Sequence, residues 1–206
     1  MNEINIKSST IEKSLELAKE FLGKLVGPSV EEMGLLFGDN IKLWRLKNQT
    51  RNFEKVKKIA NKRGIELKKI NLKVLIPYLE GISLEENEFL QDKWANLMTN
   101  YLDSNKNLTI TVYPSILTQL STNEVKILDF LNKKNRLNIG LINDHRKTKD
   151  VEYNFAEIAN LERLGLIKEV VHISKFGDGE RDYEEQNSDE FYLTSFGSDF
   201  VKACDK

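Results

Sequence analysis

Cysteine and histidine are scarce in this chain of 206 residues, which holds one cysteine, Cys204, and two histidines. A single thiol excludes an internal disulfide, and we expect a reduced, intracellular setting. Neither His145 nor His172 has a second histidine or a cysteine at a metal-ligand spacing, and we expect no metal site. Glycine-rich phosphate loops and nucleophile-elbow motifs are missing as well. The sequence therefore predicts no catalytic residues, no cofactor and no enzyme activity.

Long hydrophobic runs are also missing. No window of about 18 residues is apolar and uncharged, so a membrane-spanning helix is not predicted. The N-terminus lacks the basic start and continuous apolar stretch of a secretory signal. Residues 22–41 come nearest to a membrane segment, but four charged residues interrupt them. We interpret this stretch as packed in a core, and a membrane-active effector that inserts residues 22–41 is the alternative.

The composition is that of a folded protein. Apolar residues make up 40% and charged residues 31% of the chain, and the formal net charge of -1 indicates neither an acidic nor a basic partner. The length allows two small domains, each with its own core. We predict a mostly α protein with a small β component (α+β), in which residues 1–120 form a helical region and residues 121–206 a winged-helix-like domain.

Apolar residues at helical spacing predict the helices of the first region. One is expected over residues 11–25 and a second from Asp39 to about Arg63, which Gly64 ends as a C-cap. A central helix follows, for which Ser83 and Glu86 have the spacing of a capping box. Its apolar face includes a tryptophan that we interpret as a core anchor, and the members of that face are Leu90, Trp94, Leu97 and Tyr101.

Positive charge is concentrated in the second helix and the segment after it. Between Lys42 and Lys73 the chain carries twelve Lys or Arg and two acids. The interpretation we favour is a solvated helix face balanced by acids elsewhere, such as those of residues 85–88. The alternative is a surface for the phosphates of nucleic acid or of lipid head groups. The candidate contact residues for that role are Lys42, Arg45, Arg51, Lys55, Lys58, Lys62 and Arg63.

The pattern after residue 120 differs from that of the first region. Ser121 or Thr122 caps an amphipathic helix, and a further helix over residues 153–164 ends at Gly165. Next we expect a strand over residues 166–173, an acidic connection, a return strand and a last helix, the latter two over residues 191–194 and 195–203. This order of elements resembles a winged helix-turn-helix domain, a resemblance of fold that does not define a function.

The charge of this second region argues against DNA reading. Residues 121–206 carry thirteen basic and seventeen acidic residues, and the expected wing, residues 178–190, sets Arg181 against seven acids. A wing of that charge repels the phosphates of a duplex. We therefore favour a protein-contact or structural role for the domain, and a winged-helix transcriptional regulator is the alternative.

Short blocks along the chain are similar to the Abi-alpha family, a bacterial and phage-borne family associated by name with abortive infection. The most specific block is SLEENEFLQDKWANLM, at residues 83–98. Four further blocks occur in the same order as in the family: LLFGD at 35–39, WRLKN at 44–48, YPSI at 113–116 and LS at 120–121. The resemblance spans about residues 20–170. It implies a cytoplasmic antiviral defence role and brings no catalytic residues.

Together these observations predict a non-enzymatic, abortive-infection-like defence protein that acts by macromolecular binding. We expect a protein partner, with nucleic acid as a second candidate through the basic helix at residues 42–63 and a membrane surface as a third. The amphipathic helices and their aromatic anchors also suit self-association, although no residue specifies how many copies associate.

Overall fold

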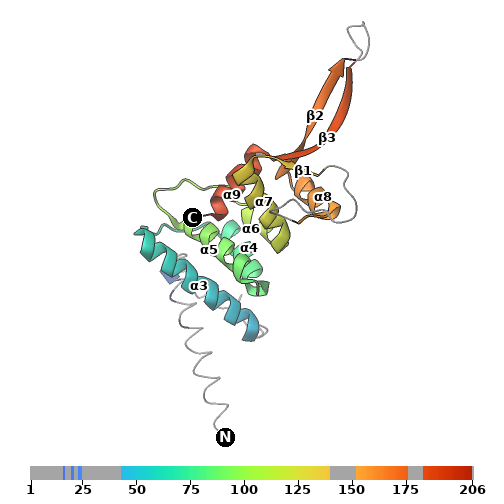
Figure 1. Ribbon diagram of the computed structural model, residues 1–206. Coiled ribbons are helices and arrows are strands. Elements are labelled where there is room, and N and C mark those ends of the chain that lie inside the picture. Colours follow the sequence, from blue (N-terminus) through green and yellow to red (C-terminus); the bar gives the residue numbers. More distant parts are fainter. Residues whose placement is uncertain are drawn as a thin grey trace. The chain divides into compact units, whose positions relative to one another are not determined.

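The computed structural model describes Glu16, Glu20, Gly23 and Lys24, together with residues 43–139, 152–175 and 183–205. The chain folds into two compact units: unit 1 comprises residues 1–119 and 203–206, and unit 2 comprises residues 120–202. The described part is mostly helical with a small antiparallel sheet, which confirms the predicted α+β class (Figure 1). That residues 1–120 and 121–206 fold as separate domains stays a prediction.

Unit 1 is built around a helix whose sides are almost all covered. Its helices are α3 (Leu43–Arg63), α4 (Leu72–Leu84), α5 (Glu88–Leu102) and α6 (Tyr113–Leu117). Both α4 and α5 pack against α3, and α6 packs against α4 and α5. Of the 15 residues of α5, twelve are buried. As predicted, Trp94 is a core anchor, 1% exposed, and its ring meets that of Tyr78 edge to face with centroids 5.8 Å apart.

The contact between α4 and α5 depends on a glycine. A Cβ atom added to Gly81 would lie 2.5 Å from the Cη2 and Cζ2 atoms of Trp94 and 2.9 Å from the Cγ2 atom of Thr118. Such distances are shorter than van der Waals contact, so α4 approaches the indole this closely only because position 81 has no side chain.

We predict that Gly81→Ala lowers the free energy of unfolding by about 1–3 kcal/mol, the usual cost of overpacking a core. In an unobstructed helix the same change is stabilising, because alanine has the higher helix propensity. The sign of the change in a urea titration therefore tests the contact. Lys126→Ala, at an exposed helical position of unit 2, is the control and should shift stability by no more than about 0.5 kcal/mol. A more stable Gly81→Ala protein would contradict this account of the packing.

The predicted capping box at Ser83 is wrong. Helix α4 continues through Pro77 and Gly81 to Leu84, and Ser83 lies inside it, buried, with its hydroxyl donating to the carbonyl oxygen of Glu80 at 2.7 Å. Helix α5 begins later, and its N-cap is Asn87, whose side chain accepts from two backbone N–H groups. Packing of Gly81 against Trp94 holds this part of the chain in α4, which outweighs the local preference of a serine for a cap.

Unit 2 combines helices with a long β hairpin. It contains α7 (Thr122–Lys134), β1 (Leu137–Asn138), α8 (Phe155–Arg163), β2 (Ile167–Lys175), β3 (Tyr183–Leu193) and residues 195–202 of α9 (Ser195–Cys204). The sheet order is β1-β3-β2, and both pairings are antiparallel. The predicted cap at Ser121 is confirmed as a capping box with Glu124, and the helix end at Gly165 is confirmed by its φ of 70°.

Two strand predictions for unit 2 need correction. β3 begins at Tyr183, so residues 183–190 of the expected acidic wing form a strand, and the predicted return strand is only its end. The acidic side chains favour a loop, but the pairing with β2 is made by backbone N–H and C=O groups and does not depend on the charge of the side chains. β1 was missed altogether, being two residues long. Residues 140–151 of the expected winged-helix-like domain lie outside the described residues, and the winged-helix arrangement stays a prediction.

Candidate functional site: the basic helix α3

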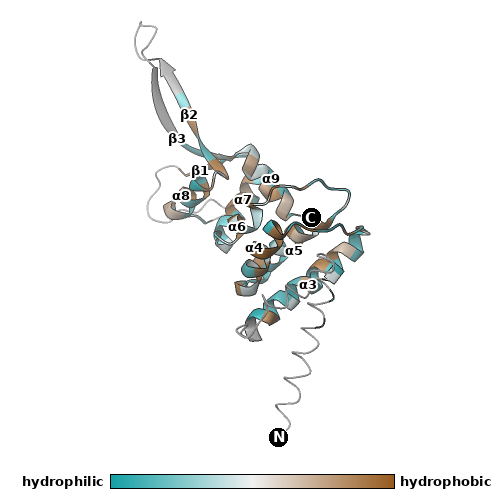
Figure 2. Ribbon diagram, turned by 180° about the vertical axis from the view of Figure 1, so that it is seen from behind, coloured by the Kyte–Doolittle hydropathy of each residue, from teal (hydrophilic) through white to brown (hydrophobic). Residues whose placement is uncertain are grey.

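The structure divides the seven predicted contact residues. Lys42 lies outside the described residues, and the other six belong to α3. Three of these are partly covered and reach towards α5, namely Arg51, Lys55 and Arg63. The other three are exposed, namely Arg45, Lys58 and Lys62. Figure 2 shows α3 as a largely hydrophilic helix with apolar residues at intervals along it.

At the start of α5, two basic residues of α3 share acidic partners. The Nζ atom of Lys55 contacts carboxylate oxygens of both Glu88 and Asp92, and the Lys55 side chain is 19% exposed. Arg51 donates to Glu88 Oε2 at 3.2 Å and to Asn48 Oδ1 at 3.1 Å. Hydrogen bonds from Lys55 and Arg51 hold the pKa of Glu88 below its usual range. The predicted balance between the basic helix and acids near residues 85–88 is therefore present for Arg51 and Lys55.

At the other end of α3, the partner of the basic residue is a pair of amides. Arg63 donates to Asn96 Oδ1 at 3.0 Å and to Asn100 Oδ1 at 3.1 Å. Asn100 also accepts from Lys106 Nζ at 2.7 Å, and its Nδ2 atom donates to the carbonyl oxygens of Ala203 at 2.8 Å and Asp205 at 3.1 Å. Asn100 is 1% exposed, so these partners replace the water that it loses on folding.

Between these two groups, buried polar side chains join the three helices. Asn52, in α3, donates to the backbone carbonyl of Gln91 at 2.9 Å and to its side-chain Oε1 atom. The hydroxyl of Tyr78, in α4, donates to Asn52 Oδ1. All three residues are fully buried, and burial raises the pKa of Tyr78 well above its ordinary value, so the hydroxyl stays a donor. These groups connect the three helices through buried hydrogen bonds.

We predict that Asn52→Leu lowers the free energy of unfolding by about 1–3 kcal/mol, because the Tyr78 hydroxyl and the Gln91 side-chain oxygen lose their buried partner. Chemical denaturation measures the effect, and Asn132→Leu, an exposed helical position of unit 2, is the matched control. Combining Asn52→Leu with Tyr78→Phe should cost less than the sum of the two single changes, since one orphaned hydroxyl is removed. Strict additivity would argue that the two side chains are not coupled.

The contact of Glu88 makes a pH-dependent contribution to stability. Its folded-state pKa is lowered, so the stabilisation is present above the ordinary glutamate pKa of about 4.3 and is lost as the pH falls through the folded value. Because the Glu88 side chain is 65% exposed, we expect Glu88→Gln to cost about 1 kcal/mol or less at neutral pH. Unfolding curves of the two proteins should therefore differ at pH 7 and converge in acid. A difference that is constant with pH would show that charge is not its cause.

Three of the four exposed lysines of α3 share one side of the helix, and the fourth, Lys57, lies 3.9 Å from Glu20. Lys47, Lys58 and Lys62 are separated by eleven and four residues, which at 3.6 residues per turn returns close to the same direction. Lys47 was not among the predicted contact residues, although its spacing from Lys58 and Lys62 is that of one helix face. One acid, Glu54, is exposed on this side, one turn before Lys58.

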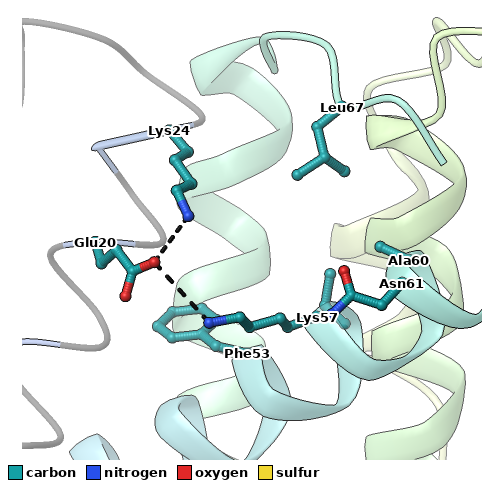
Figure 3. A pocket seen from close by; sticks show the side chains of 8 residues that line it. Glu20, Lys24, Phe53, Lys57, Ala60, Asn61 and Leu67 are labelled. Atoms are coloured by element: carbon teal, nitrogen blue, oxygen red, sulfur yellow. Dashed lines mark hydrogen bonds and ion pairs between the residues drawn. The ribbon is translucent and has the colours of Figure 1, made fainter. Parts of the chain in front are cut away.

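A small hollow lies on another side of α3, where helical residues of the N-terminal segment approach it (Figure 3). Its volume is about 100 Å³, and its lining is mainly apolar, with Phe53, Val56, Ala60 and Leu67 among the members. Glu20 accepts from Lys24 at 2.7 Å and lies 3.9 Å from Lys57 Nζ, and the hydrogen bond from Lys24 lowers the pKa of Glu20. These charges satisfy one another, so the hollow presents no group poised for chemistry.

The part of the chain that the structure describes also lacks a metal-ligand cluster and a membrane-spanning helix. Within it, no cluster of three or more His, Cys, Asp or Glu residues could hold a metal ion. His172 is exposed on β2, and His145 lies outside the described residues. In the same ranges, no helix is both long and apolar enough to cross a bilayer. Residues 22–41, the alternative membrane segment, lie outside the described residues except for Gly23 and Lys24.

The comparisons with known proteins define the class. The abortive infection alpha family model matches residues 47–204, well over half of the chain, and the chain belongs to this family. The resemblance predicted from the block at residues 83–98 is thereby confirmed. The match begins later and ends later than expected, so it includes the exposed lysines of α3, the hairpin and α9. No curated protein and no solved structure matches the chain.

Proposed function

We propose that this protein takes part in abortive-infection-type defence against phage and that it acts by binding a macromolecule inside the cell. The family supports the first part. The second part is supported by the division of polar groups in unit 1, where the buried ones hold helices together and a set of lysines on α3 faces solvent. That exposed set, Lys47, Lys58 and Lys62, carries the proposal, because three cations on one side of a rigid helix attract a negatively charged surface.

The sequence-based alternatives receive less support from the described residues. A transcriptional regulator would need basic residues on α8, where Arg163 is the one basic side chain and donates to its neighbour Asn160 at 2.7 Å. Glu157 and Glu162 belong to the same helix. For a membrane-active effector, most of the segment concerned lies outside the described residues, and the apolar side of α3 is buried.

We predict that bacteria expressing the protein yield fewer phage and that the triple variant Lys47→Glu, Lys58→Glu, Lys62→Glu loses this protection. Reversing three exposed charges removes the attraction for an acidic partner while leaving the buried contacts of α3 in place. Plaque counts over a panel of phages measure the effect, and thermal unfolding followed by circular dichroism verifies that the variant folds.

The matched control reverses three exposed lysines of unit 2, Lys126, Lys133 and Lys168, which should leave protection intact. Replacing the α3 set by arginine should also preserve it, since the charge remains. Full protection by the α3 triple Glu variant would refute a role for this surface. An absence of protection by the wild-type protein across the panel would refute the defence role.

A further inference from the structure

We propose that the exposed lysines of α3 bind the phosphate backbone of double-stranded nucleic acid without reading its sequence. This inference rests on the proposed function and names the partner of the same surface. The contact residues are Lys47, Lys58 and Lys62, whereas Arg51, Lys55 and Arg63 belong to the internal structure of unit 1.

The arginines of α3 that lie against α5 already have partners within unit 1. The guanidinium groups of Arg51 and Arg63, the groups best suited to two-pronged recognition of a carboxylate or phosphate, donate to side chains that include Glu88 and Asn96. Arg45 is exposed on another side of the helix, and the exposed cations on the side of Lys47 are lysines, which act as point charges and impose little direction on their partner. A partner whose charge repeats along its length meets that requirement better than one with a single oriented group.

This side of α3 lacks exposed apolar side chains that could anchor a partner. Between residues 45 and 63, no large apolar side chain is exposed, and the exposed ones of unit 1, such as Leu72 and Leu84, belong to other segments. Protein interfaces are depleted in lysine and depend on buried aromatic, apolar or arginine anchors. Single-stranded nucleic acid is held by stacking of bases on aromatic rings, and membrane-surface helices insert an apolar face. A surface with charge alone fits the outside of a duplex.

The distance along α3 from Lys47 to Lys62 also suits a duplex. Fifteen residues separate Lys47 from Lys62, which corresponds to about 22 Å along a straight helix at 1.5 Å per residue. A B-form duplex carries one phosphate charge per about 1.7 Å of its axis, and its major groove is about 12 Å wide. The lysines can therefore reach phosphates on both strands that border a groove, with no fixed register. Glu54, on the same side, opposes this binding.

The experiment is fluorescence anisotropy of the purified full-length protein with labelled duplexes of two unrelated sequences over a series of salt concentrations. With three phosphate contacts, a plot of log affinity against log salt should have a slope of about -2.7, from about -0.9 per contact. Changing any one of Lys47, Lys58 and Lys62 to Gln should reduce the steepness by about 0.9, equally for both sequences.

Two further variants sharpen the test. Glu54→Gln removes the opposing charge and should tighten binding to both duplexes. Lys126→Gln, at an exposed helical position of unit 2, is the control for loss of one positive charge and should leave the slope unchanged. A single strand of the same sequence and vesicles containing an anionic phospholipid serve as competitors, and both should displace the labelled duplex poorly.

Several results would overturn the inference. They are no duplex binding at low salt, a slope that the three Gln variants do not change, a marked preference for one duplex sequence, and stronger competition by the single strand or the vesicles. Failure of the duplex-binding inference can be distinguished from failure of the proposed defence function. If the α3 triple Glu variant loses protection while no duplex is bound, the partner is an acidic protein surface and the defence role stands. If duplex binding holds while that variant protects fully, the binding site is correct and its role in defence is not.

Discussion

The burial of α5 is the constraint on which unit 1 depends. A helix covered on nearly all sides cannot leave its polar side chains to water, so each must find a partner on a neighbouring segment. Asn52 of α3 donates a hydrogen bond to Gln91. Asn100 accepts one from Arg63 and donates to backbone carbonyls near the end of the chain. Lys93, 6% exposed, pairs with Asp205 at 2.6 Å. Since an unpaired buried cation or amide is costly, these partners also fix which side of α3 faces inwards.

That constraint sorts the basic residues of α3 into two kinds. Where the helix meets α5, positive charge neutralises Glu88 and Asp92 or satisfies amide oxygens, and it contributes to packing as much as to charge. On the side of Lys47, Lys58 and Lys62, no contact among the described residues of unit 1 requires lysine, because exposed positions tolerate most helix-forming residues. The described contacts therefore do not explain why lysine recurs at these positions. For this reason Lys47, Lys58 and Lys62 are better candidates for contact with a partner than the whole basic segment between Lys42 and Lys73.

Local patterns predicted what local forces decide. The cap at Ser121 and the glycines that end α3 and α8 were predicted because caps depend on neighbours within a few residues. Ser83 had an equally good local pattern and failed, because the fit of Gly81 against Trp94 is a contact between segments that spacing alone does not reveal. The basic helix was likewise found from composition, but the assignment of Lys55 to an internal pair and of Lys47 to solvent needed the position of α5.

The reach of the family match has a physical counterpart in unit 1. Asn100 donates to the carbonyl oxygens of Ala203 and Asp205, and carbonyls at the end of a helix have no partner within it. The end of α9 therefore supplies acceptors that α5 needs, and the Asn100 amide supplies donors that the end of α9 needs. Residues 47–204, the matched range, run from the exposed lysines of α3 to this last turn. Arg63 of α3 donates to the same Asn100 side chain, so contacts near both ends of that range meet at one buried residue of unit 1.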